Sequence, residues 1–245
     1  MTEAAPALTA SFWQSFSNPP LLWLSITLAV YLATHWLYQR SNGNPLLLPV
    51  LTGVVIIVAL LWSTDTAYPD YFDSVRLLYF LIGPATVALA IPLCSQIARL
   101  RQMWLPLLVA LLAGSATAVI SAIGIAWLFG GSLETIISLA PKSATIPIAM
   151  GVAERTGGLG PLAAVAVAVT GISGAMMAPL MRRLLHIDDP AITGFAIGVS
   201  AHAIGTSRAI QLGEVAGAFS ALGMALNGIA TALLVPLALQ LLGWL

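Results

Sequence analysis

The feature that most limits how this chain can fold is a succession of long apolar runs without charged residues. Only 7% of the residues are charged and 59% are hydrophobic, whereas an ordinary soluble domain carries about 25% charged residues. A bilayer requires roughly 20 apolar residues per helix, and backbone polar groups inside it must be satisfied within helices. The sequence therefore predicts an all-α polytopic membrane protein.

Eight membrane segments are expected, and some of them can be re-entrant. They cover about 21–38, 46–62, 77–97, 102–133, 139–158, 160–181, 191–213 and 215–245. No soluble domain or low-complexity linker interrupts them. We therefore expect one integral membrane domain over 1–245, in which 1–40 form an amino-terminal extension and the first helix.

Composition and missing motifs exclude several functions. Nine basic residues balance nine acidic ones, so no overall positive field favours nucleic acid. Cys94 is the only cysteine, which excludes an intrachain disulfide and a cysteine-based metal site. No nucleotide-binding loop, hydrolase elbow or zinc-protease motif occurs. We expect neither an enzyme nor a metal or cofactor site.

The distribution of arginines gives conflicting orientations for the two halves. Cytoplasmic loops are enriched in Lys and Arg, so Arg40 and the pair Arg99/Arg101 favour the cytoplasm, with the amino terminus outside. Simple alternation then places Arg182 and Arg183 outside, against the same rule. Either the segment 139–158 does not cross the membrane, or the rule fails here.

Three apolar runs contain residues that interrupt helices. Gly83-Pro84 lies in the third run, Pro141 in "LAPKSATIPIA" and Gly205 in the seventh run. Such breaks persist in a membrane only where protein or water satisfies the freed backbone. "ATVALA" (85–90) and "ATIPIA" (144–149) also resemble each other. This similarity indicates either a weak internal repeat or chance in helices rich in Ala and Thr.

Lys142 is the only charged residue between Glu134 and Glu154. A charge at the bilayer centre costs about 2.5 to 3.5 kcal/mol on insertion scales, so it requires a partner, water or an anionic ligand. Ser143 and Thr145 are good N-cap residues, so a half-helix with a free, positive amino end is expected just after Lys142. The alternative is that Lys142 extends to a nearby interface.

The seventh segment repeats this pattern around Gly205. Arg208 is its only full charge from 190 to 213, and His202, Thr206 and Ser207 lie close to it in sequence. A guanidinium can hold a carboxylate by two hydrogen bonds. The alternatives are a packed, hydrogen-bonded histidine, and an Arg208 that pairs with Glu214 or reaches the surface.

Two further polar residues are candidates for coupling. Glu154 is either a proton-linked carboxylate or part of a solvated membrane edge. Asn227 lies in "GMALNGIA", which together with "GISGA" (171–175) offers small residues for close helix contact. These faces favour a transport unit that is at least a homodimer, although such faces serve packing within one chain equally well.

Three stretches resemble one known family. "GPATVALAIPL", "PKSATIPIAMGVAERTGG" and "GFAIGVSAHAIGTSRAIQLGEVAGAFSALGMALNGI" are similar to the LrgB/CidB family of bacterial membrane proteins over about 41–245. The resemblance implies a small LrgA/CidA-like membrane partner and a role in murein hydrolase activity and autolysis. The family also includes part of the plastid glycolate/glycerate translocator, and bacterial members are linked to pyruvate.

The residues and the resemblance together favour a secondary carrier in the bacterial cytoplasmic (inner) membrane. Its substrates would be small monocarboxylates such as glycolate, glycerate, lactate or pyruvate, with proton or sodium coupling left open. The expected substrate-binding residues are Lys142, Ser143, Thr145, His202, Thr206, Ser207 and Arg208. The alternative is a holin/antiholin-like modulator of autolysis that acts with the LrgA/CidA-like partner.

Overall fold

The structure, a computed structural model, describes residues 19–41 and 43–245. These residues form helices, turns and loops, and no strand occurs among them. Residues 1–18 of the expected amino-terminal extension lie outside the described part. The contacts group into two compact units, 1–88 and 89–245, and each is described by itself. The single membrane domain expected over 1–245 stays a prediction.

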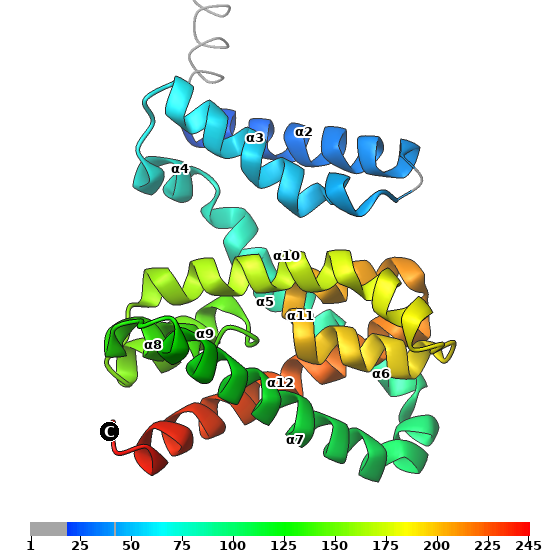
Figure 1. Cartoon of the computed structure of the whole chain (residues 1–245). Helices are drawn as coiled ribbons and strands as arrows, with labels where there is room; N and C mark the ends of the chain where they lie inside the picture. Colours follow the sequence, from blue (N-terminus) through cyan, green and yellow to red (C-terminus); the bar gives the residue numbers. More distant parts are fainter. Residues whose placement is uncertain (1–18, 42) are drawn as a thin grey trace, which may run out of the picture. The chain divides into compact units, whose positions relative to one another are not determined.

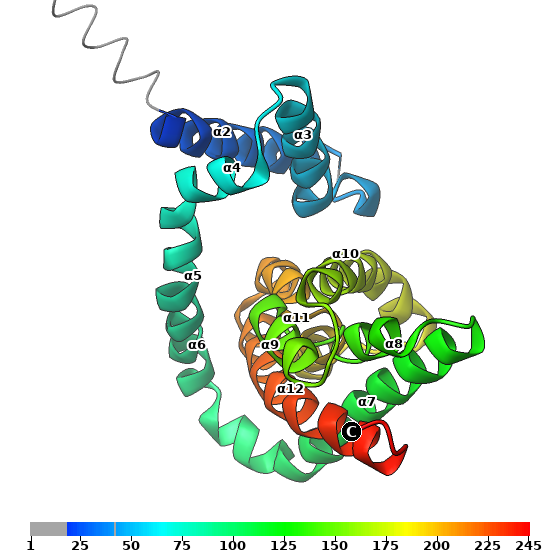
Figure 2. The ribbon, with the colours of Figure 1, turned by 90° about the vertical axis from the view of Figure 1, so that its left-hand side faces the viewer.

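The first unit is a small group of apolar helices (Figure 2). Trp23 of the first described helix packs edge-on against Tyr71, with ring centroids 5.6 Å apart, and the hydroxyls of Thr27 and Tyr71 lie 3.1 Å apart. The elements are α2 (Pro19–Arg40), the short 3-10 helix η1 (Pro45–Leu47), α3 (Pro49–Ser63), α4 (Tyr68–Ser74) and α5 (Arg76–Ala88).

The second unit contains three long helices and several shorter pieces (Figure 1). The long helices are α7 (Ile97–Leu128), α10 (Gly160–Leu184) and α12 (Glu214–Leu241). The others are α6 (Ala90–Ser95), α8 (Leu133–Leu139), α9 (Ile146–Arg155) and α11 (Pro190–Leu212).

Five helical stretches within the described residues are long and apolar enough to cross a membrane. Pro49–Ser63 is a shorter apolar helix. The five stretches are Leu21–Arg40, Arg76–Ser95, Ile97–Leu128, Gly160–Leu184 and Glu214–Leu241. The two expected segments absent from this set, 139–158 and 191–213, have a different geometry.

The segment 139–158 returns to the side from which it enters. The N–H of Leu159, just before α10, donates to Oγ of Ser138 in α8 at 2.7 Å. Between these two points the chain makes a turn at 140–145 and comes back through α9, which is about 15 Å long for its ten residues. We call α8, this turn and α9 the first hairpin.

The helix α11 also doubles back, at His202. His202 has φ 41° and ψ −135°, which is not helical. A Cβ added to Gly205 would lie 3.0 Å from the carbonyl oxygen of Ile197. In an uninterrupted helix, residues eight apart are about 12 Å apart along the axis. The second half, 203–212, therefore packs back against the first half, 190–201, and we call α11 the second hairpin.

The two hairpins enter from opposite ends of α7. Ile136 of the first hairpin packs in one buried cluster with Ala126, near the end of α7. Arg99, near the start of α7, forms an ion pair of 2.7 Å with Asp189 at the start of the second hairpin. About 40 Å of helix separates Arg99 from Ala126. Figure 1 shows α8 and α9 at one end of α10 and the loop that leads into α11 at the other end.

This topology removes the conflict between the arginine positions. Because the first hairpin does not cross, the end of α10 with Arg182 and Arg183 lies on the same side as Arg99 and Arg101. We call this the basic side. The rule that cytoplasmic loops are rich in Lys and Arg holds for all four arginines if the basic side faces the cytoplasm.

Two of the expected helix breaks are not at the expected residues. The Gly83-Pro84 pair lies inside α5, which continues to Ala88. The break in the second hairpin is at His202, and Gly205 is helical. Gly205 makes room for Ile197 and Ala201, so its missing Cβ serves packing. Pro141 lies in the turn between α8 and α9.

The structure favours chance as the source of the similarity between 85–90 and 144–149. Residues 85–88 continue α5 and the helix is interrupted only at Leu89. Residues 144–149, in contrast, lead from a turn into the start of α9. The two stretches are thus in different local structures.

Candidate functional site

The tip of the first hairpin is a tight turn followed by an uncapped helix end. The N–H of Lys142 donates to the carbonyl of Leu139 at 3.1 Å, and the N–H of Ala144 donates to that of Pro141 at 3.0 Å. Thr145 occupies the N-cap position of α9, but its side chain makes no capping hydrogen bond. The amino end of α9 therefore keeps N–H groups and a positive dipole available for an anion.

Lys142 is half-buried in this turn. Among the described residues, its ammonium group has no hydrogen bond and no ion pair. A partly desolvated ammonium without a carboxylate partner favours an anionic ligand. The role of Lys142 in binding an anion stays a prediction.

Ser143 links this tip to two long helices. Its carbonyl accepts a 2.8 Å hydrogen bond from Nδ2 of Asn227 in α12, and Oδ1 of Asn227 accepts a 2.6 Å bond from Oγ of Ser115 in α7. The hydroxyl of Ser143 is buried and has no hydrogen-bond partner among the residues that the structure describes. A buried hydroxyl that lacks a hydrogen bond costs about 1 to 3 kcal/mol, so this group is a candidate ligand for a substrate oxygen.

The tip of the second hairpin is held against α10. Nε2 of His202 donates to the carbonyl of Val167 at 2.9 Å. A Cβ on Gly171 would collide with the imidazole ring, so this glycine allows the contact. Val167 also packs in one buried cluster with Ala144 of the first tip. The two tips therefore meet at the same part of α10.

One face of α12 connects the two tips. Ser220 faces Oγ1 of Thr206 at 2.9 Å, and Thr206 donates to the carbonyl of His202 at 2.8 Å. Seven residues further along α12, about 10 Å by helix geometry, Asn227 holds the first tip. The hydroxyl of Thr231, one turn later, is fully buried, and no residue of the described part of the chain forms a hydrogen bond with it.

The remaining candidates of the second hairpin lie beyond its tip. Ser207 is exposed and donates to the carbonyl of Ile204 at 2.7 Å. Arg208 is half-buried, donates to Oε1 of Gln211 at 3.0 Å, and lies about 9 Å along the helix from His202. Lys142, Ser143 and Asn227 are brought together, whereas Ser207 and Arg208 lie nearer the base of their hairpin.

Glu154 lies in the last turn of α9, and its carboxylate contacts the start of α10. A Cβ on Gly160, the first residue of α10, would collide with the Glu154 carboxylate. A carboxylate at this position is stabilised by the positive end of the helix dipole. This contact gives Glu154 a structural role, and its coupling role stays a prediction.

The small-residue stretches pack within the chain. Gly174 lies against Ala201, Gly223 against Phe195 and Gly228 against Ile148. The small residues of "GISGA" thus allow the second hairpin to pack closely against α10, and those of "GMALNGIA" allow both hairpins to pack closely against α12. These glycines therefore give no argument for a homodimer, which stays a prediction.

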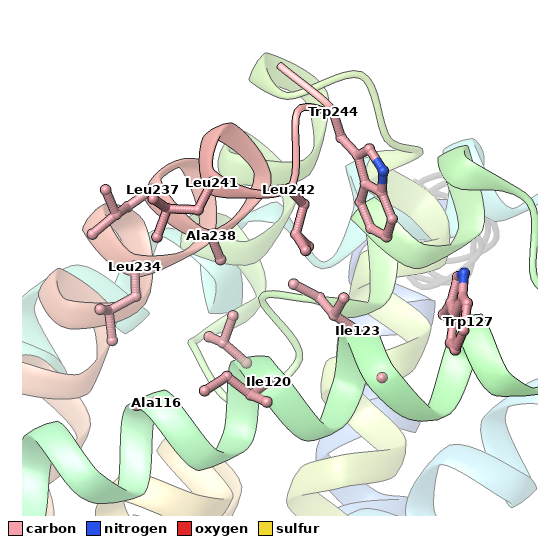
Figure 3. A pocket seen from close by; sticks show the side chains of 12 residues that line it. Ala116, Ile120, Ile123, Trp127, Leu234, Leu237, Ala238, Leu241, Leu242 and Trp244 are labelled. Atoms are coloured by element: carbon pink, nitrogen blue, oxygen red, sulfur yellow. The ribbon is translucent and has the colours of Figure 1, made fainter.

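A separate apolar groove of about 700 Å³ runs between α7 and α12. Figure 3 shows the apolar side chains of both helices around it, with Trp127 and Trp244 at one end. No charged side chain lines it, so it offers nothing to a carboxylate. Tryptophans of this kind are enriched at membrane interfaces.

Sequence reasoning missed several residues of the site. Ser115, Ser220 and Thr231 are uncharged residues in apolar helices, and the backbone carbonyl of Val167 carries no sequence signal. Only the contacts above reveal them. Within the described part of the chain, no group of three or more His, Cys, Asp or Glu side chains is placed to hold a metal.

The chain matches a family model described as the LrgB-like family over residues 27–241. It is 36% identical over 216 residues to a Bacillus subtilis protein named YxaC, covering 88% of this chain and 94% of that protein.

Two further relatives carry a functional name. The antiholin-like protein LrgB of Bacillus subtilis is 28% identical over 228 residues, covering 91% of this chain and 97% of that protein. The antiholin-like protein LrgB of Bacillus cereus is 26% identical over 224 residues, with the same coverage. No solved structure matches the chain.

Proposed function

The chain belongs to the LrgB-like family of multi-pass membrane proteins, and from this premise we propose that it is a secondary carrier of small monocarboxylates. Glycolate, glycerate, lactate and pyruvate are the substrates of this class that we expect, and the bacterial cytoplasmic membrane is the expected location. The observation that supports a carrier is the meeting of two opposed hairpin tips beside a lysine without a partner.

The chemistry of the first tip suits a carboxylate with a neighbouring oxygen. The Lys142 ammonium and the uncapped amino end of α9 supply positive charge. The unpaired Ser143 hydroxyl supplies a donor for a hydroxyl or keto oxygen. Irregular backbone inside a membrane persists where it lines a cavity, and carriers commonly bind substrate between interrupted helices.

Transport of this kind requires no cofactor and no covalent chemistry. We propose that the protein is not an enzyme and that an ion gradient or the substrate gradient drives it. Proton and sodium coupling are both open, and Glu154 and Asn227 are the residues to test for either.

The names of the relatives favour a second function. Two of them are called antiholin-like, and these names support modulation of autolysis more directly than they support transport. In this second proposal the chain acts together with a small LrgA/CidA-like membrane protein, and its effect arises from an assembly in the membrane.

Uptake into proteoliposomes tests the carrier. The purified chain would be reconstituted with and without the LrgA-like protein, and labelled glycolate, lactate and pyruvate would be offered to the vesicles. We expect saturable uptake by the chain that unlabelled monocarboxylates compete away. Uptake no faster than in protein-free vesicles, under both conditions, would reject the carrier.

The variant Lys142→Met separates the two proposed functions in cells. The proposed carrier needs Lys142 at the tip of the first hairpin to bind its anionic substrate. An assembly that modulates autolysis without binding a substrate does not need this charge. If Lys142→Met abolishes uptake in vesicles and also abolishes the effect on autolysis, transport underlies both. If autolysis control survives without uptake, the antiholin-like function is independent of transport.

A further inference from the structure

The boundaries of the elements in the second unit repeat at a fixed spacing. The first hairpin begins at Leu133 and α10 ends at Leu184, while the second hairpin begins at Pro190 and α12 ends at Leu241. Both pairs are 57 residues apart (190 minus 133, and 241 minus 184). At the same offset, Thr145, which begins the returning helix of the first hairpin, corresponds to His202, where the second hairpin turns.

Residue identities follow the same offset without a gap. Ser143-Ala144 corresponds to Ser200-Ala201 in the tips. Identical residues also recur in the spans, at Gly171 and Gly228, Ile172 and Ile229, Ala175 and Ala232, Pro179 and Pro236, and Leu180 and Leu237.

The packing repeats as well. In the first copy, Ala149 lies in one buried cluster with Ala163 and Val167. The corresponding residues of the second copy are Thr206, Ser220 and Met224, and Thr206 contacts both of the others. Because the hairpins enter from opposite ends of α7, the two copies are inverted relative to each other.

Each tip is tied to the span of the other copy. Asn227 of α12 holds the carbonyl of Ser143 in the first tip at 2.8 Å, and His202 of the second tip holds the carbonyl of Val167 in α10 at 2.9 Å. The glycines show the same crossing, since Gly228 lies against Ile148 and Gly171 against His202. One hydrogen bond per tip therefore crosses between the copies.

We propose that residues 133–184 and 190–241 are inverted copies of one hairpin-and-span unit, and that their tips are paired gates on either side of one substrate site. The Asn227–Ser143 bond closes the gate opposite the basic side, and the His202–Val167 bond closes the gate on the basic side. Asn227 and His202 are positioning residues, and the substrate binds between the tips. This inference rests on the proposed carrier function, because gates on opposite sides are needed for alternating access.

Two variants release one gate each. Asn227→Ala removes the bond to Ser143, and Ser115→Ala is its control because it removes only the other hydrogen bond of Asn227. His202→Gly removes the imidazole and suits φ 41°. His186→Gly is its control, because His186 has φ 52° in an exposed loop away from the tips.

Hydrogen exchange of the full chain in lipid nanodiscs measures each gate separately. We expect Asn227→Ala to speed exchange about tenfold or more at 140–149 and to leave 200–207 unchanged, and His202→Gly to do the reverse. Both controls should behave like the parent. If each variant loosens both tips equally, or neither tip, the paired gates are rejected.

A second measurement tests the gates even if Asn227→Ala or His202→Gly does not fold. This measurement uses a chain that carries Cys94→Ser and Ser143→Cys and keeps Asn227 and His202. A membrane-impermeant maleimide would be added to sealed vesicles from one side or from the other, and the rate of labelling at position 143 would be measured. An alternating site is exposed to each side in turn, and within the described residues only the Asn227–Ser143 hydrogen bond holds this tip to α12. We therefore expect faster labelling from the side opposite the basic side, and equal labelling from both sides or faster labelling from the basic side would overturn the assignment of the gates. If these results hold while no monocarboxylate is taken up, the gates stand and the proposed substrate class fails.

Discussion

At the scale of single residues, the proposed carrier function depends most on Lys142. Its ammonium lies in a turn between two helices of one hairpin, and the described residues offer it no anionic partner. Its neighbour Ser143 has a buried hydroxyl that forms no hydrogen bond within residues 19–41 and 43–245. One small carboxylate with an adjacent oxygen would give the Lys142 ammonium an anionic partner and the Ser143 hydroxyl a hydrogen-bond acceptor.

Replacing Lys142 with methionine tests this role. The change keeps an apolar stem and removes the charge, so we expect normal insertion and a loss of glycolate uptake of about ten- to a hundredfold, the value of a hydrogen bond to a charged group. Arg155→Met is the matched control, because Arg155 is an exposed cation at the far end of α9. Uptake per folded protein is the measurement, and equal uptake by both variants would contradict a binding role.

Glycine at 198 is required by close helix packing. A Cβ there would run into the backbone of Ser220, and overpacking against atoms that cannot move costs about 1 to 3 kcal/mol or more. We therefore expect Gly198→Ala to lower the unfolding temperature. Gly124→Ala should be neutral or raise it, since nothing lies within 4 Å of that site and alanine favours helices by about 1 kcal/mol. Thermal unfolding in detergent, followed by tryptophan fluorescence, measures both, and an unchanged unfolding temperature for Gly198→Ala would argue against the close packing of α11 on α12.

At the scale of elements, the residue ranges of the crossing helices could be predicted from the sequence, but the turning back of the second hairpin could not. The expected runs at 21–38, 160–181 and 215–245 agree closely with α2, α10 and α12, because length and hydropathy decide such spans. The second hairpin has 23 residues, as many as a crossing helix. Only contacts between residues far apart in a straight helix, such as Gly205 and Ile197, show that it turns back.

The base of the second hairpin offers a test of one element boundary. Oδ1 of Asp189 caps the N–H of Ala191 at 2.7 Å, and both carboxylate oxygens accept from Arg99 at 2.7 Å. Asp189→Asn keeps the capping oxygen and loses the ion pair, which is partly exposed and worth about 0.5 to 1 kcal/mol. Asp189→Ala also loses the cap, worth about 1 kcal/mol more.

We therefore expect the order parent, Asp189→Asn, Asp189→Ala in decreasing stability, with the first step reduced at high salt. Denaturation midpoints at low and high salt measure this order. Two variants of equal stability would mean that Asp189 does not cap the hairpin.

At the scale of the whole molecule, the sequence indicated the family and a pair of interrupted segments but not their arrangement. The 57-residue repeat is carried mainly by Gly, Ala, Ile and Leu, which are common in every membrane helix, so its register is visible only once the hairpin ends are known. The contact of Ser143 with Asn227 joins residues 84 positions apart. Local pattern contains no information on such pairs, and they decide where the site lies.

Counterflow in proteoliposomes of the purified chain is the most direct test of a carrier with two gates. Vesicles loaded with unlabelled glycolate would be diluted into a trace of labelled glycolate outside. A carrier exchanges the two through one alternately exposed site, so we expect the label to rise transiently above its equilibrium level inside, and Lys142→Met to remove this rise. A label that only approaches equilibrium, at a rate independent of the internal glycolate, would indicate a pore and would contradict the carrier.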